Sequence, residues 1–134
     1  MRPLAFVILL ALAACDTLGV YPPEAPVTAA DLSLTTDRSE YRSGDDVTLT
    51  LRNDGDREVL TGVLTCSLLE RRTDDGWTRD VDRNERGCIL LGITVPPGDA
   101  YTDEADLDGV RAGTYRFVQA FGDVEVATGS FVVR

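Results

Sequence analysis

The sequence predicts an all-β fold: a two-sheet antiparallel β-sandwich of about seven strands over residues 31–134, preceded by a signal peptide and a flexible tether. Apolar residues recur at every second position through most of this region, which is the period of a half-buried strand. Clusters of glycine, proline, asparagine and aspartate interrupt the pattern about every ten residues, as expected between the strands of a sandwich. No segment after residue 30 shows the apolar period of a helix.

The early strands are predicted by alternation. Segment 31–37, DLSLTTD, places two leucines on one face, and segment 45–53, DDVTLTLRN, is the plainest strand of the chain because β-branched and leucine residues alternate with polar ones. The turn sequence NDGD at residues 53–56 ends it. The next strand is expected over residues 64–68, with Leu64, Cys66 and Leu68 on one face.

The later strands are placed by turn signals. Residues 74–76, DDG, predict a hairpin whose return strand opens at Trp77. A further strand is expected over residues 88–95 and is closed by PPG at residues 96–98. The last two strands, TYRFVQAF and SFVVR, are separated by the turn signal of Gly122 and Asp123.

One tyrosine near the end of the chain sharpens the assignment. Tyr115 lies at the start of a late strand in the sequence LDGVRAGTY. This arrangement resembles the tyrosine corner of immunoglobulin-like and fibronectin type III domains, in which the phenol bonds to the backbone a few residues upstream. The alternative is an ordinary core tyrosine.

Five short motifs extend this resemblance over about residues 31–134. They are Tyr41-Arg42-Ser43-Gly44-Asp45, VTLTLRN, DDGW, Val95-Pro96-Pro97-Gly98 and AGTYRF. The series resembles bacterial immunoglobulin-like sandwiches and is also similar to a proteinase-inhibitor family of this architecture found in bacilli. The resemblance implies the fold and no binding residue, because these motifs are turns and core positions.

The first residues have the layout of a secretory signal. A basic start at Arg2 is followed by an apolar run of about a dozen residues, shorter than the roughly 20 that a membrane-spanning helix needs. Leu12-Ala13-Ala14-Cys15 resembles the lipobox of bacterial lipoproteins. The resemblance implies cleavage after Ala14, a diacylglycerol on the Cys15 sulfur and acylation of the new amino group, which together anchor the protein to a membrane.

Two alternatives to this anchor stay open. Residues 11–13, ALA, also form a site for ordinary signal cleavage, and Cys15 could be a chance residue in an uncleaved segment. The expected division is a signal peptide over residues 1–14, a lipidated tether over 15–30 and the sandwich over 31–134. Asp16 resembles an inner-membrane retention residue of enteric bacteria, and the choice between inner and outer membrane stays open.

The expected state of the other two cysteines depends on the lipid anchor at Cys15. If Cys15 is lipidated, Cys66 and Cys88 remain as an even pair in an oxidising compartment, so we expect a disulfide between them. Two buried free thiols are the alternative. In antibody domains the bridge joins strands B and F, whereas here Phe117 stands where the second cysteine of that bridge would be.

Composition excludes several classes of function. The formal charge is −10, and removal of residues 1–14 takes away Arg2 and no acid, which gives −11 for the mature chain. Such a body repels nucleic-acid phosphates and anionic lipid headgroups, so we expect no nucleic-acid binding. The chain has no histidine and no lysine, which removes the commonest general base and the Schiff-base amine.

Metal sites and catalytic motifs are likewise not indicated. Residues 80–84, DVDRN, imitate the start of a calcium loop, but Glu85 and Leu91 occupy positions that need glycine and an acid. We therefore expect no metal, no cofactor and no enzymatic activity.

One segment departs from the half-buried pattern. Residues 88–95, CILLGITV, are apolar on both faces. One interpretation is that the segment is a central strand, or that a bulge at Gly92 turns its later residues into the core. The other is that Ile89, Leu91 and Ile93 form an exposed apolar strip that docks a partner. The best interpretation is an envelope lipoprotein whose domain binds or scaffolds another protein. A proteinase inhibitor is the alternative, and a small lipid-anchored enzyme comes third.

Overall fold

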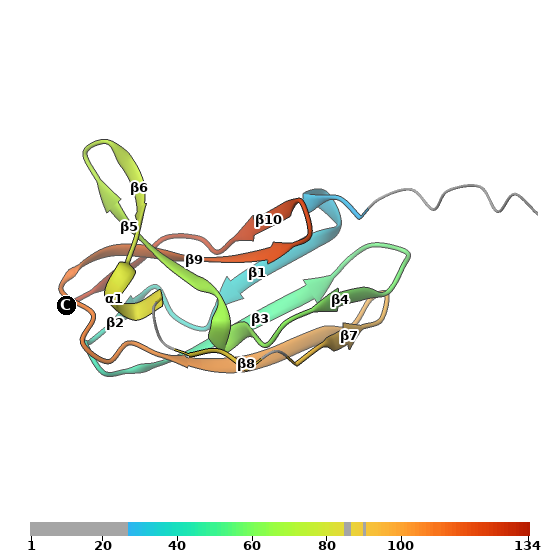
Figure 1. Cartoon of the computed structure of the whole chain (residues 1–134), viewed down its shortest axis with the longest axis horizontal. Coiled ribbons are helices and arrows are strands. Elements are labelled where there is room, and N and C mark those ends of the chain that lie inside the picture. Colours follow the sequence, from blue (N-terminus) through green and yellow to red (C-terminus); the bar gives the residue numbers. More distant parts are fainter. Residues whose placement is uncertain (1–26, 85–86, 90) are drawn as a thin grey trace, which may run out of the picture.

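The computed structural model describes residues 27–84, 87–89 and 91–134, which form a two-layer β-sandwich (Figure 1). The strands are β1 (Leu32–Thr36), β2 (Glu40–Tyr41), β3 (Asp46–Asn53), β4 (Val59–Thr61), β5 (Leu68–Thr73), β6 (Gly76–Arg79), β7 (Ile93–Val95), β8 (Ala100–Asp106), β9 (Gly113–Phe121), β10 (Val124–Ala127) and β11 (Phe131–Val133). Two 3₁₀ turns, η1 (Ala29–Asp31) and η2 (Leu64–Cys66), and a single α-turn, α1 (Val81–Asn84), complete the described residues.

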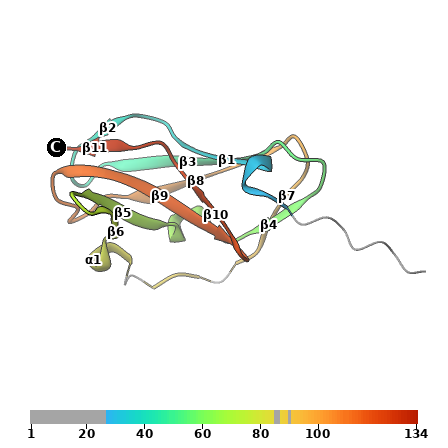
Figure 2. The same cartoon turned by 90° about the horizontal axis from the view of Figure 1, so that it is seen from above.

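Most of the strands belong to two main sheets, which form the two layers of the sandwich and extend along its long axis (Figure 2). One sheet has the order β1-β3-β8, and the other has the order β2-β11-β9-β5-β6, with β10 also paired to β9. In immunoglobulin-like terms β1, β3 and β8 correspond to strands A, B and E, and β5, β9 and β11 to strands C, F and G. A short β4-β7 pair lies beside them. The predicted sandwich is therefore confirmed.

Alternating apolar residues from both sheets form the core. Val47, Leu49 and Leu51 of β3 are fully buried, as their spacing predicts. They face the other sheet, where the rings of Phe117 and Phe131 stack at 5.5 Å between centroids. Burying one such side chain contributes about 1.5–3 kcal/mol, so this layer of apolar residues is the main source of stability.

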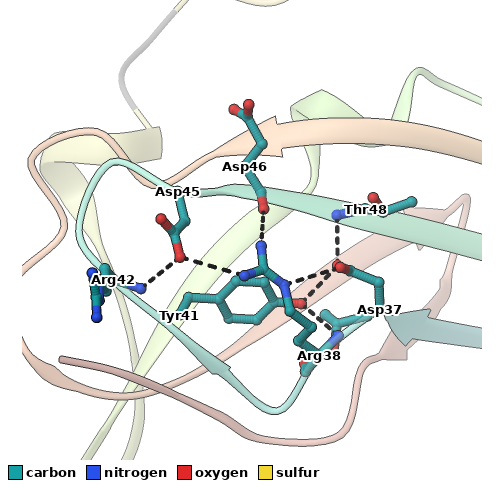
Figure 3. Close-up of polar contacts among 8 residues, drawn as sticks. Asp37, Arg38, Tyr41, Arg42, Asp45, Asp46 and Thr48 are labelled. Atoms are coloured by element: carbon teal, nitrogen blue, oxygen red, sulfur yellow. Dashed lines mark hydrogen bonds and ion pairs between the residues drawn. The ribbon is translucent and has the colours of Figure 1, made fainter.

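The crossing from β1 in one sheet to β2 in the other is held by a polar network (Figure 3). One carboxylate oxygen of Asp37 accepts hydrogen bonds from the Tyr41 hydroxyl at 2.8 Å and from the Thr48 amide at 2.9 Å. The Arg38 guanidinium covers the Tyr41 ring at 4.6 Å. Asp45 accepts from the Arg42 amide at 2.9 Å and closes the next turn. The motif Tyr41-Arg42-Ser43-Gly44-Asp45 therefore stabilises the turns around β2.

Asn53 holds the opposite end of the sandwich together. Its side chain is fully buried, and its amide nitrogen donates to the carbonyl oxygens of Arg57 at 2.6 Å and Val95 at 3.0 Å. Its side-chain oxygen accepts from the Gly55 amide at 3.1 Å. The final asparagine of the VTLTLRN motif therefore ties the β3–β4 turn to β7.

Two predicted strands are wrong. Residues 64–68 form η2, and β5 begins only at Leu68, because nearby groups take over the local backbone donors: the Thr65 amide donates to Asp103 Oδ2 at 3.2 Å. Of the described residues in the range 88–95, which leave out residue 90, only Ile93–Val95 form a strand, β7. Cys66 and Cys88 consequently lie outside the strands on which the sequence pattern places them.

The described fold starts before the predicted boundary at residue 31. Val27 packs against the core, and Thr28 and Asp31 exchange hydrogen bonds that close η1, including Thr28 Oγ1 to Asp31 Oδ2 at 2.8 Å. Residues 27–30 of the predicted tether therefore belong to the domain. Within the described residues no helix is long and apolar enough to cross a membrane.

Candidate protein-docking groove

An apolar groove with a volume of about 390 Å³ lies on the flank of the sandwich, beside the β4–β7 pair. It is lined by Leu60, Thr61, Gly62, Val63, Cys66, Cys88, Ile89, Leu91, Gly92 and Gln119. We call this feature the flank groove. Its walls come from β4 and from the segment before β7, where the described residues Cys88, Ile89, Leu91 and Gly92 are not paired in a strand and leave the groove open.

Three exposed side chains make the surface of the flank groove apolar. Leu60 and Ile89 are each 70% exposed and Leu91 is 52% exposed, values that large apolar residues rarely reach together at one site. Ile89 and Leu91 were predicted to be exposed, and the structure places both in the groove. Exposed apolar area of this kind loses its contact with water when a partner covers it.

Ile93 does not belong to this set, so that part of the predicted strip is wrong. It is half-buried, packs against the core and pairs with Thr61 across β4 and β7. The reason is the start of regular pairing at Ile93, which turns its side chain toward the body. Leu60 was missed, although its place between buried Val59 and Thr61 was a signal, since alternation puts the middle residue outside.

The back wall of the flank groove is rigid and polar beneath its apolar rim. The Ser67 hydroxyl donates to Gln119 Oε1 at 2.6 Å, and Gln119 Nε2 donates to the Thr61 hydroxyl at 3.3 Å. All three residues are buried. A buried and satisfied network of this kind restricts side-chain rearrangement, so the shape of the groove is held in place.

A disulfide closes one end of the groove. Cys66 and Cys88 are bonded, with their Cα atoms 5.7 Å apart and a sequence separation of 22. The bond ties the segment that carries Ile89 to η2. In the absence of strand pairing, it is the covalent link that keeps this wall of the groove against the sandwich.

Among the described residues that line the flank groove, none carries an ionisable side chain. These residues offer a ligand apolar surface and the hydrogen-bonding hydroxyl and amide groups of Thr61 and Gln119. Within the described residues, no group of three or more cysteine, aspartate or glutamate side chains could hold a metal ion. Asp80 instead caps α1, because its carboxylate accepts from the Arg83 amide at 3.1 Å.

Cys15 and Ala14, the predicted lipidation and cleavage residues, lie outside the described residues. The predicted corner tyrosine lies inside them. The Tyr115 hydroxyl donates to the Arg111 carbonyl at 2.9 Å, four residues upstream, which is the bond that a tyrosine corner makes.

This chain resembles one family of bacterial domains and, weakly, a part of a larger enzyme. Among solved structures, a β-glucosidase from Erythrobacter marinus aligns with a TM-score of 0.41 and 13% identity over 76% of this chain, which spans only 15% of the length of that enzyme. No curated protein matches. The family model of the bacterial Ig-like domain matches residues 28–131, and the chain belongs to that family.

Proposed function

We propose that this chain is a lipid-anchored protein of the bacterial cell envelope whose Ig-like domain binds or scaffolds another protein without catalysing a reaction. The observation that carries the proposal is the flank groove, in which Leu60, Ile89 and Leu91 are exposed together. Membership of the bacterial Ig-like domain family supports a binding module rather than an enzyme.

The expected occupant is an apolar segment of a second protein. The groove is uncharged on a chain whose formal charge is −10, so an anionic membrane surface or a nucleic acid would be repelled by the surrounding body before it reached the apolar rim. An uncharged apolar segment meets no such barrier. It would gain about 25 cal/mol for each Å² of apolar surface removed from water.

Site-specific photocrosslinking in intact cells tests the docking surface. A photoreactive residue at position 91 should form an adduct with a different protein, whereas the same residue at position 132 should not, because Val132 is an exposed apolar residue outside the groove. The double variant Leu60→Ser, Ile89→Ser should abolish the adduct without unfolding the domain, since both side chains are exposed. An adduct containing two copies of this chain, or one formed equally from position 132, would contradict the proposal.

The anchor is tested separately at Cys15. Cys15→Ser should prevent lipidation and leave either the unprocessed precursor or a protein that partitions into water. Mass spectrometry of the N-terminal peptide and detergent phase partitioning measure the two outcomes. Wild-type partitioning with an unchanged N-terminal mass would show that the anchor lies elsewhere. Proteinase inhibition, the alternative function, stays a prediction.

A further inference from the structure

A second cavity lies at the far end of the sandwich from the start of the described fold. It has a volume of about 260 Å³ and is lined by Arg71, Thr73, Thr78, Arg79, Asp80, Gly109, Arg111 and Tyr115. Its walls are the β5–β6 hairpin and the connection between β8 and β9. We call it the arginine cavity. Neither the family match nor the proposed docking function accounts for it.

The hairpin forms this cavity because it projects beyond the rest of its sheet (Figure 1). Successive side chains of a strand point to opposite faces. Arg71 pairs with Thr78 in register, and both line the cavity. Arg72 pairs with Trp77 on the other face, where its guanidinium lies 5.4 Å from the centre of the indole ring. Neighbouring arginines of one hairpin therefore have different surroundings.

The charge inside the cavity is opposite to that of the protein. Arg71 and Arg111 bring two guanidinium groups to its lining and Asp80 brings one carboxylate, which gives a local formal charge of 2 − 1 = +1 on a chain of charge −10. Arg79 also borders the cavity, but it follows Thr78 in β6, so its side chain lies on the opposite face of the hairpin, with Trp77. Like charges gathered around a cavity repel one another, and an anion between them relieves that repulsion.

The positions of these groups suit an oxyanion. Arg71 Nη2 donates to the Ala112 carbonyl at 3.3 Å, which holds the guanidinium at the cavity and leaves its other N–H groups for a ligand. On the same wall the Thr73 hydroxyl donates to the Gly76 carbonyl at 3.2 Å, and the Thr78 hydroxyl, 3.5 Å from that of Thr73, can donate one neutral hydrogen bond to a ligand.

We propose that the arginine cavity binds a small oxyanion group, a carboxylate or a phosphate, with Arg71 and Arg111 as its charged contacts. Guanidinium groups pair with the oxygens of both anions through two parallel hydrogen bonds. The volume is below the range of drug-sized ligand pockets, roughly 300–1,000 Å³, so the cavity accepts a small molecule or the end group of a larger one.

The experiment is an NMR titration of the full chain with inorganic phosphate and, separately, with acetate, at constant ionic strength maintained with chloride. We expect saturable shifts of the amide signals of Thr78, Gly109 and Tyr115 with at least one of the two anions. Saturation with phosphate alone identifies a phosphorylated ligand, and saturation with acetate alone identifies a carboxylate. Shifts that follow chloride equally, or that do not saturate with either anion, would overturn the proposal.

Matched variants separate a specific site from general attraction. Arg71→Gln and Arg111→Gln should each raise the dissociation constant at least tenfold, whereas Arg72→Gln, which removes the same charge from the outer face of the same hairpin, should leave it within twofold. The bond from Tyr115 to the Arg111 backbone persists in Arg111→Gln, and unchanged signals elsewhere in the spectrum verify the fold. Equal weakening by all three variants would show that the anion follows net charge and that the cavity is not a site.

Discussion

The Tyr115 hydroxyl and the Arg111 carbonyl oxygen, 2.9 Å apart, close the turn that leads into β9. Only 1% of Tyr115 is exposed, and its ring lies 6.3 Å from that of Phe131. Burial acts to raise the pKa of this phenol, so the hydroxyl keeps its proton and remains a donor over the whole neutral range. The residue therefore joins core packing to the geometry of a turn.

Removing that hydroxyl should destabilise the domain. Tyr115→Phe keeps the ring and leaves the Arg111 carbonyl without its partner, which should cost about 1–3 kcal/mol of unfolding free energy. Tyr101→Phe is the matched control, because the Tyr101 hydroxyl donates at 3.1 Å to Asp103 in a more exposed setting, and it should cost less. Chemical denaturation measures both. Equal costs would show that the corner bond adds nothing beyond an ordinary surface hydrogen bond.

Asn53 should be among the least replaceable polar residues. Asn53→Ala removes one side chain that satisfies three backbone groups, on Arg57, Val95 and Gly55, so we expect a loss of about 2–4 kcal/mol from an uncompensated buried site. Asn53→Asp should be worse at neutral pH, because a carboxylate would face two carbonyl oxygens. Thermal denaturation orders the variants. An Asn53→Asp protein as stable as the wild type would contradict this account.

Reduction of the Cys66–Cys88 bond should lower stability by about 3 kcal/mol, since the bond closes a loop of 22 positions in the unfolded chain. It should also loosen the wall of the flank groove that carries Ile89. Denaturation with and without reductant gives the first quantity, and protease cleavage within residues 87–92 gives the second. Identical cleavage rates in the two states would mean that packing alone holds this wall.

Arg116 tests a simple sequence argument. Alternation places it opposite buried Tyr115, which predicts an exposed residue whose loss is neutral. In the structure its side chain is 30% exposed, forms a 2.7 Å ion pair with Glu70 and lies 4.5 Å from the Trp77 ring centre. Arg116→Ala should therefore cost about 1 kcal/mol and change the fluorescence of Trp77. Arg52→Ala, whose ion pair with Asp54 is exposed, should be close to neutral.

Acid should weaken the β1–β2 crossing. Partial burial acts to raise the pKa of Asp37, but hydrogen bonds from Tyr41, Thr48 and Arg38 outweigh it, and the pKa lies below its ordinary value of 3.8. A lowered pKa contributes stability above the unfolded value, and that contribution is lost as pH falls through the folded one. Stability should thus decline below about pH 4, and Asp37→Asn should flatten the decline. Hydrogen bonds from Thr28 also lower the pKa of Asp31, so part of the decline in stability should remain in the Asp37→Asn variant.

The elements that sequence predicts correctly are those defined by local rules. β3 follows from strict alternation, the β5–β6 hairpin from its DDG turn, and the Tyr115 corner from spacing. The errors lie at residues 64–68 and 88–92, where a disulfide and contacts with distant residues such as Asp103 and Gln119 decide the conformation.

The candidate sites divide in the same way. Ile89 and Leu91 stand out in sequence because their segment is apolar on both faces, whereas Leu60 joins them only through the fold. The arginine cavity has no sequence signature, since Arg71 and Arg111 are 40 positions apart and meet only because the hairpin overhangs the β8–β9 connection.

The parallel pairing of β2 with β11 has a mechanical consequence. The first described residues, which lead into β1, and the C-terminus lie at opposite ends of the long axis (Figure 2). The two strands are joined by hydrogen bonds such as Val132 N to Ser39 O and Arg134 N to Tyr41 O, each 2.9 Å. Tension between those ends would slide β11 along β2, so the bonds would have to break together rather than one after another. The domain is therefore built to withstand stretching along its length far better than peeling at its edges.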